Sequence, residues 1–217
     1  MQVVTDLSAW PWPNERSVIT IGAYDGVHLG HQAVIGQVRE RAARVGARSV
    51  VVTFDRHPAS VVRPDAAPRL LTNTAQKLEL LAATGVDAVV VLSFTPEQSK
   101  EIPSDFVQRV IVDGLHASTV IVGSDFHFGH MRQGNVTLLR EMGERHDFTC
   151  EPVVLISRGD DIDEPVSSTA IRRALAGGEI ATAAKMLGHS YEVVGTVVTG
   201  DQRGRTIGFP TANVEIP

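Results

Sequence analysis

GAYDGVHLGH, residues 22–31, connects an apolar run at 18–21 to a helical pattern at about 31–45. A strand therefore leads through a glycine-containing turn to the N-terminus of a helix, where unpaired N–H groups and the positive end of the helix dipole favour anions. His28 and His31 stand three residues apart, so both imidazoles lie on one side of this helix start. The pattern indicates a site that binds the phosphates of a ligand.

Two further features of this turn favour a phosphate ligand. The first helical turn, residues 32–35, has no Asp or Glu that would compete with a bound anion. Gly30 leaves out a side chain where a ligand would approach the backbone. The alternative is an ordinary strand–turn–helix crossover in which the histidines only cap a turn, and we favour the phosphate site. The other residues of the turn that we expect to line it are Gly22, Tyr24, Asp25, Gly26 and Gly30.

Composition restricts the class of protein. With 217 residues, 43% of them hydrophobic, the chain can bury a sizeable core. The net charge of −5 argues against a nucleic-acid or anionic-membrane partner, and no apolar run approaches the roughly 20 residues that span a bilayer. Cys150 is the only cysteine, which excludes an internal disulfide and a cysteine-built metal site. We expect a cytoplasmic protein, with its oligomeric state left open, a homo-oligomer included.

Short apolar, β-branched runs alternate with helical patterns along the chain. The expected strands are near 18–22, 49–54, 88–93, 118–122 and 152–156. The expected helices are near 31–45, 73–84, 104–113 and 135–146. Nearly continuous apolar runs are typical of strands covered on both faces, and the alternation predicts an α/β fold with a doubly wound parallel sheet. Ligands bind at the carboxyl ends of such strands, which is where the phosphate-binding turn lies.

The last quarter of the sequence has a different character. Helical patterns at 168–176 and 179–187 precede a β-type stretch at 191–199. We place a domain boundary that divides the chain into 1–187 and 188–217. About 30 residues are too few for an independent core, so we expect the second segment to be the first strands of a domain whose remainder is absent.

A second anion site is expected at the helix near 168–176. Arg172 and Arg173 lie in or near its first turn, where positive charge opposes the helix dipole. A bound anion would make this arrangement favourable. The alternative is a helix that Ser168 or a neighbouring residue merely caps.

A planar ligand is expected near the loop at 122–129, which follows a strand. The loop supplies the carboxylate of Asp125 and aromatic rings that suit stacking on a flat ring. The alternative is a strand-end turn whose aromatic side chains fold into the core. The strand end at 53–58 has the same two interpretations, and considered alone it favours the structural one.

Five motifs carry a resemblance to a known family. They are H-x-G-H at 28–31, T-F-D-x-H-P at 53–58, G-x-D-F-x-F-G at 123–129, S-S-T-x-I-R at 167–172 and G-R-T-I-G-F-P-T-A-N at 204–213. In this order they resemble the prokaryotic FAD synthetases, which are bifunctional riboflavin kinase/FMN adenylyltransferases, over essentially the whole chain. H-x-G-H alone is shared by many nucleotidyltransferases, whereas its combination with the last motif is highly specific. The resemblance implies a Rossmann-like nucleotidyltransferase domain followed by the truncated start of a β-barrel riboflavin kinase domain.

The resemblance also implies an activity and roles for residues. The enzyme would transfer AMP from ATP to FMN, giving FAD and pyrophosphate with Mg²⁺, and a full-length parent would also phosphorylate riboflavin. The implied catalytic residues are His28, His31 and Arg172, and the implied ligands of the outer ATP phosphates also include Ser168 and Thr169. The residues implied to lie around the flavin are Phe54, His57, Asp125 and Phe128, and those implied to bind Mg²⁺ in the kinase are Thr211 and Asn213. The partners would be small molecules, ATP and FMN or riboflavin.

Other functions stay open at this stage. One alternative is another nucleotidyltransferase of the H-x-G-H type, and another is a non-catalytic module that binds a nucleotide or a flavin. A fragment of a class I aminoacyl-tRNA synthetase also shares H-x-G-H, but this chain lacks a basic face and a convincing second signature loop. We expect no nucleic-acid partner and no membrane partner.

Overall fold

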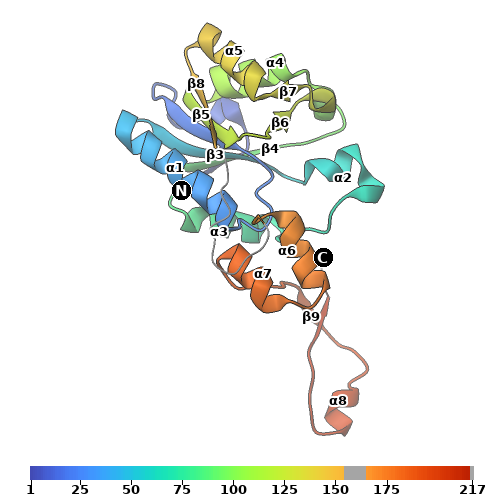
Figure 1. Cartoon of the computed structure of the whole chain (residues 1–217). Helices are drawn as coiled ribbons and strands as arrows, with labels where there is room; N and C mark the ends of the chain where they lie inside the picture. The colour runs from blue at the N-terminus through green and yellow to red at the C-terminus, as the bar shows by residue number, and fades with distance from the viewer. Residues whose placement is uncertain (154–164, 216–217) are drawn as a thin grey trace.

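A parallel sheet of six strands forms the centre of the computed structural model, which describes residues 1–153 and 165–215 (Figure 1). The strand order is β1-β4-β3-β2-β5-β8, and every neighbouring pair is parallel. The strands are β1 (Gln2–Val4), β2 (Ser17–Ile21), β3 (Arg48–Phe54), β4 (Ala88–Leu92), β5 (Ala117–Gly123) and β8 (Thr149–Val153). The predicted α/β fold with a doubly wound parallel sheet is confirmed.

The helices that connect these strands agree with the predicted ranges, except for α2, which is additional. They are α1 (Leu29–Val45), α2 (Pro58–Val62), α3 (Thr74–Ala83), α4 (Pro103–Phe106) continued by a π-helix (Val107–Gly114), and α5 (Val136–His146). The short helix α2 and the edge strand β1 were not predicted, because elements of three to five residues are too short to show a periodicity. The last predicted strand, 152–156, begins earlier as β8, and its residues 154–156 lie outside the described residues.

Small elements occupy the loops at the carboxyl ends of the strands. The hairpin of β6 (His127–Phe128) and β7 (Gly134–Asn135) follows β5. Single turns of 3-10 helix are found at Leu7–Ala9, Pro64–Ala66 and Gln98–Lys100, whereas His130–Arg132 forms a turn in which Met131 and Arg132 have positive φ angles. These loops build up the edge of the sheet at which a ligand is expected.

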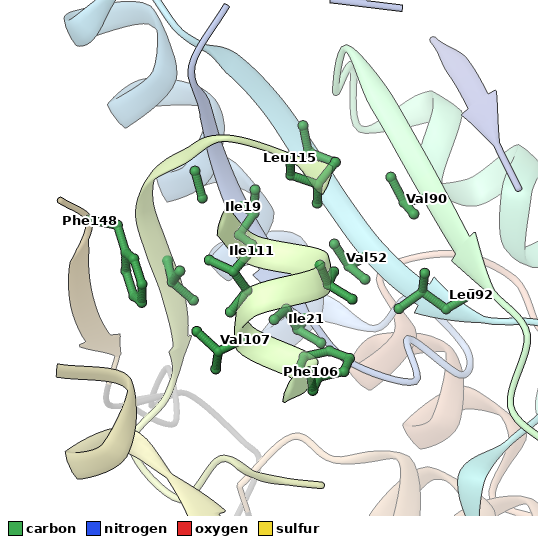
Figure 2. Packing of buried hydrophobic residues seen from close by; sticks show 14 of the residues in the cluster. Ile19, Ile21, Val52, Val90, Leu92, Phe106, Val107, Ile111, Leu115 and Phe148 are labelled. Carbon is green, nitrogen blue, oxygen red and sulfur yellow. The ribbon is translucent and has the colours of Figure 1, made fainter. Parts of the chain in front are cut away.

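Apolar side chains cover both faces of the sheet, which explains why its strands read as continuous apolar runs. On one face Ile19 and Val52 pack with Val107 and Ile111 of the π-helix (Figure 2). On the other face the side chains of β2 and β3 pack against α1, whose Ile35 is fully buried. Adjacent residues of one strand therefore belong to opposite cores.

The strand order places a crevice beside β2. The chain proceeds from β2 through β3 to β4 on one side and then returns to place β5 on the other side of β2. The loops that leave β2 and β5 therefore diverge at their carboxyl ends, which is the switch point where doubly wound sheets bind ligands. The turn at 22–28 occupies this switch point.

Two helices and an exposed hairpin complete the described chain. The helices α6 (Ser168–Ala176) and α7 (Ile180–Leu187) pack together around Leu71. Beyond them, β9 (Thr196–Val198) and β10 (Asn213–Glu215) form an antiparallel pair, with the short helix α8 (Arg203–Thr206) between them (Figure 1). Nearly all side chains from 192 to 215 are exposed, in agreement with a segment that has no core of its own. The domain boundary and the β-barrel stay predictions.

Candidate active site

The two histidines of the turn lie in direct contact at the start of α1. His28 is the N-cap residue of the helix, and its Nδ1 accepts a hydrogen bond from the His31 N–H at 3.3 Å. The two rings stack with centroids 3.6 Å apart and planes 17° apart. The prediction that both imidazoles share one side of the helix start is confirmed. The capping role considered as the alternative is also present, so His28 shapes the helix end as well.

Burial keeps both imidazoles neutral near pH 7. His28 is only 4% exposed, and its burial lowers its pKa to about 4, with Asp25 raising it and Arg172 lowering it. Burial and the neighbouring His28 hold the pKa of His31 well below its usual value. The Nδ1 atom of His31 is enclosed without a hydrogen-bond partner among the described residues. A polyanion placed next to these rings would raise both pKa values, because an opposite charge favours the protonated form.

The backbone between β2 and α1, residues 22–28, which we call the phosphate loop after its predicted role, is strained. Tyr24 and Val27 have positive φ angles of 51° and 39°, which β-branched and aromatic residues rarely adopt. Gly26 has a φ of 82°, and a Cβ there would lie 2.8 Å from Leu71 Cδ1. Strain of this kind persists only where surrounding contacts hold the loop, and it is concentrated at functional sites.

Asp25 supplies several of those contacts. Its buried carboxylate accepts hydrogen bonds from the Leu71 N–H at 2.9 Å and the Thr72 N–H at 3.1 Å, and it forms an ion pair with Arg172. The Arg172 Nε also donates to the Arg69 carbonyl at 2.7 Å. Asp25 was expected to line the ATP site, but its side chain is turned into the protein, so it anchors the phosphate loop. Arg172 lies beside this loop, with its guanidinium on Asp25.

The N-terminus of α6 faces the same loop as the N-terminus of α1. Ser167, a direct neighbour of Ser168 and so within the capping alternative, is the N-cap residue and accepts from the Ala170 N–H at 3.1 Å. Ser168 instead donates through its Oγ to the Asp25 carbonyl at 3.0 Å, and Thr169 is exposed at the helix start. The first turns of both helices lack acidic residues. Two positive helix ends therefore meet at one loop, which is an arrangement suited to a polyphosphate.

Of the four side chains expected near a flavin, three lie at or after the ends of β3 and β5, and one lies in the core. His57 is the N-cap residue of α2, and its pKa is lowered by burial and influenced by Asp25 and Arg172, so it shares the electrostatic environment of the phosphate loop. Phe54 is half-buried at the end of β3, and Asp125 is exposed in the turn after β5. Phe128 lies in the main core, where the alternative interpretation of its loop places it.

Aromatic packing explains the position of Phe128. Its ring lies 5.6 Å from that of Phe106 and stacks 5.5 Å from that of Phe126. Gly134 lies so close that a Cβ there would be 2.8 Å from the ring. Phe128 therefore supports the loop after β5 from the core side.

Sequence reasoning missed two residues that hold the phosphate loop in place. Lys77 on α3 is buried, and its Nζ donates to the Ala23 carbonyl of the loop at 3.5 Å and to the Phe54 carbonyl at 2.8 Å. His189 donates through its Nε2 to the Gly26 carbonyl at 3.0 Å, which connects the loop to the residues after α7. A charged residue four positions before Leu81 on the buried face of α3 was the signal for Lys77. Only the folded chain brings His189 to the loop.

The predicted kinase ligands Thr211 and Asn213 lie elsewhere. Both belong to the exposed C-terminal hairpin, outside the contacts around the phosphate loop. Within the described ranges no cluster of three or more His, Cys, Asp or Glu residues could hold a metal ion. None of the helices in those ranges combines the length and hydropathy that crossing a membrane requires.

Comparison with known proteins adds independent information. A family model described as FAD synthetase matches residues 11–170, and one described as riboflavin kinase matches residues 187–217. A protein of Listeria monocytogenes named bifunctional riboflavin kinase/FMN adenylyltransferase is 40% identical over 94% of this chain. Proteins of the same name from Escherichia coli K12 and Pseudomonas fluorescens are each 37% identical, over 94% and 100% of this chain.

The chain spans part of the length of these relatives. It covers 64% of the Listeria and Escherichia proteins and 68% of the Pseudomonas protein. A crystal structure described as that of a macrolide-efflux protein from Streptococcus pneumoniae is similar to this chain, with a TM-score of 0.79 and 26% identity. That similarity covers 99% of this chain and 68% of the other, so the two share the fold described above.

Proposed function

The chain belongs to the FAD synthetase family, and on this premise we propose that it transfers AMP from ATP to FMN, giving FAD and pyrophosphate. The observation that supports this proposal best is the pair of stacked imidazoles, His28 and His31, at the switch point of the sheet. The N-termini of α1 and α6 meet at the same loop. Such a site suits the triphosphate of a nucleotide.

The proposed reaction needs positioning more than it needs a protein nucleophile. An oxygen of the FMN phosphate attacks the α-phosphorus of ATP, a new P–O bond forms, and the bond to the β-phosphate oxygen breaks as pyrophosphate leaves. The second ionisation of a phosphate monoester lies near pH 6, so the attacking oxygen is already charged at pH 7. The protein has to align two polyanions and balance the charge that grows on the leaving group.

The described side chains suit those two tasks. His28 and His31 would donate to the triphosphate, and the proximity of its charge would favour their protonation. Ser168, Thr169 and Arg172 would bind the outer phosphates from α6, with Arg172 exchanging its contact with Asp25 for a phosphate oxygen. Phe54, His57 and Asp125 would lie on the flavin side, and Phe128 would support the loop after β5.

We propose Mg²⁺ as part of the bound nucleotide. The residues around the phosphate loop fit this form, because the Asp25 carboxylate is turned into the protein, where it accepts hydrogen bonds from the Leu71 and Thr72 N–H groups. Mg²⁺ at nucleotide sites is held largely by phosphate oxygens and water, with few protein ligands. When bound, it would neutralise part of the phosphate charge. Thr211 and Asn213 stay proposed ligands for the kinase reaction only.

The match of residues 187–217 supports a second proposal. A protein that carries this segment together with the rest of a riboflavin kinase domain would also phosphorylate riboflavin. Its substrates would then be ATP and riboflavin or FMN, and we propose that it works in the cytoplasm.

One assay tests the adenylyl transfer. The purified chain is incubated with FMN, ATP and Mg²⁺, the products are separated by chromatography, and pyrophosphate is measured in parallel. FAD formed in equal amount to pyrophosphate supports the proposal. Pyrophosphate release only with another phosphate acceptor would indicate a different nucleotidyltransferase. Tight binding of FMN or ATP without pyrophosphate release would indicate a binding module.

A further inference from the structure

Lys77 lies where a lysine is unfavourable for packing alone. Its side chain is on the inner face of α3, and the residue is only 8% exposed. Leu81, one turn later on the same face, is fully buried. Burial lowers the pKa of the Lys77 ammonium, because the charged form loses hydration. A leucine or methionine would fill this position at lower cost, so a specific contact has to explain the charge.

The contacts of the ammonium account for all of its donors. Lys77 Nζ donates to the Phe54 carbonyl at 2.8 Å, the Thr53 hydroxyl at 3.3 Å and the Ala23 carbonyl at 3.5 Å. An ammonium has three N–H donors and no acceptor, so each donor has one partner. The Thr53 hydroxyl in turn donates to the Ala23 carbonyl at 3.1 Å.

These partners belong to the two halves of the proposed active site. Ala23 is in the phosphate loop, which would hold the ATP phosphates. Phe54 ends β3 on the side proposed for the flavin, immediately before the segment that leads to His57. Lys77 therefore connects the backbones of the two proposed substrate sites through one buried charge. Since all three of its donors are used in these contacts, none is left to bind a substrate.

Building on the proposed function, we propose that Lys77 is a positioning residue that sets the distance between the phosphate loop and the flavin-side end of β3. In-line attack requires the FMN oxygen to lie about 3–3.5 Å from the α-phosphorus, and a misplacement of about 1 Å can cost roughly 100-fold in rate. A residue that sets this distance acts on turnover. The affinity for each substrate alone depends on the local contacts of its own half-site.

The test compares Lys77→Met with Lys185→Met, which changes an exposed lysine on α7. Melting temperatures of both variants are measured first, and FAD formation is then followed well below them. For Lys77→Met we expect kcat to fall by about 100-fold, while KM for ATP and for FMN change by less than about threefold. Lys185→Met keeps the wild-type kcat.

Thr53→Val provides a second, milder variant. It keeps the shape of the buried side chain and removes the hydroxyl that joins Lys77 to Ala23, so we expect kcat to fall by about tenfold. In the double variant the effects should be less than additive, because both changes act on the same contact.

Each outcome decides between positioning and another role. A Lys77→Met enzyme with wild-type kcat and a raised KM, or with only a lowered melting temperature, overturns the proposal. If Lys77→Met does not fold, a wild-type kcat in Thr53→Val overturns it. Wild-type protein that forms no FAD overturns the proposed function itself, and the inference with it, whereas active wild type with an equally active Lys77→Met overturns only the role of Lys77.

Discussion

Replacing Asp25 by alanine should destabilise the fold far more than replacing a surface carboxylate. The change leaves the Arg172 guanidinium, 20% exposed, without its carboxylate, and it removes the acceptor of the Leu71 and Thr72 N–H groups. Removing one partner of a buried ion pair costs about 3–5 kcal/mol, and the partial exposure of Arg172 favours the lower value. Each unsatisfied N–H adds about 1 kcal/mol or more.

We therefore expect Asp25→Ala to lower the free energy of unfolding by about 5 kcal/mol, a large part of the roughly 5–15 kcal/mol of an ordinary domain. Asp25→Asn keeps an acceptor for the N–H groups and should lose about half as much. The assay is urea denaturation followed by circular dichroism.

Glu151→Gln is the matched control for the loss of a carboxylate charge. Its partner is Arg41, and this pair is much more exposed than Asp25 and Arg172. We expect a change below about 1 kcal/mol for this variant. An Asp25→Ala protein within about 1 kcal/mol of wild type would refute the reasoning that this carboxylate anchors the phosphate loop.

Three further outcomes follow from the site. His31→Ala should lower kcat/KM for FAD formation by about 100-fold in a folded protein, the effect of losing one donor to developing charge, and wild-type turnover would exclude that role. Between pH 6.5 and 4 the unfolded chain binds more protons than the folded one, since burial lowers the pKa of His28 to about 4. The free energy of unfolding should therefore decrease as the pH is lowered from 6.5 to 4, by up to about 1.4 kcal/mol per pH unit from this group. His28→Asn, which keeps a capping side chain, should reduce this pH dependence in urea denaturation. Gly26→Ala should lower the free energy of unfolding by about 1–3 kcal/mol, because the added Cβ would meet Leu71 and Leu187 at a residue with a left-handed backbone. It should also weaken ATP binding measured by calorimetry. An unchanged affinity would show that the phosphate loop does not bind the nucleotide.

Much of the fold could be predicted because its signals are local. The apolar runs of β2 to β5 and the helical patterns between them are properties of consecutive residues, and both faces of the sheet are covered as such runs require. The position of His28 and His31 at a strand-to-helix junction was predictable for the same reason, since their spacing alone places them on one side of a helix.

Only the tertiary structure decided which side chains from distant parts of the sequence contact one another. Asp25 and Arg172 are 147 positions apart, and no periodicity indicates that they form an ion pair. The same holds for Lys77 with Ala23, 54 positions apart, and for Phe128, whose ring could have faced a ligand or the core. The periodicity of a sequence specifies which face of a helix or strand is buried. The packing of whole elements decides which side chains meet on that face. The position of the phosphate loop between a strand and a helix was therefore predictable from local sequence, whereas the contacts that hold this loop in place were not.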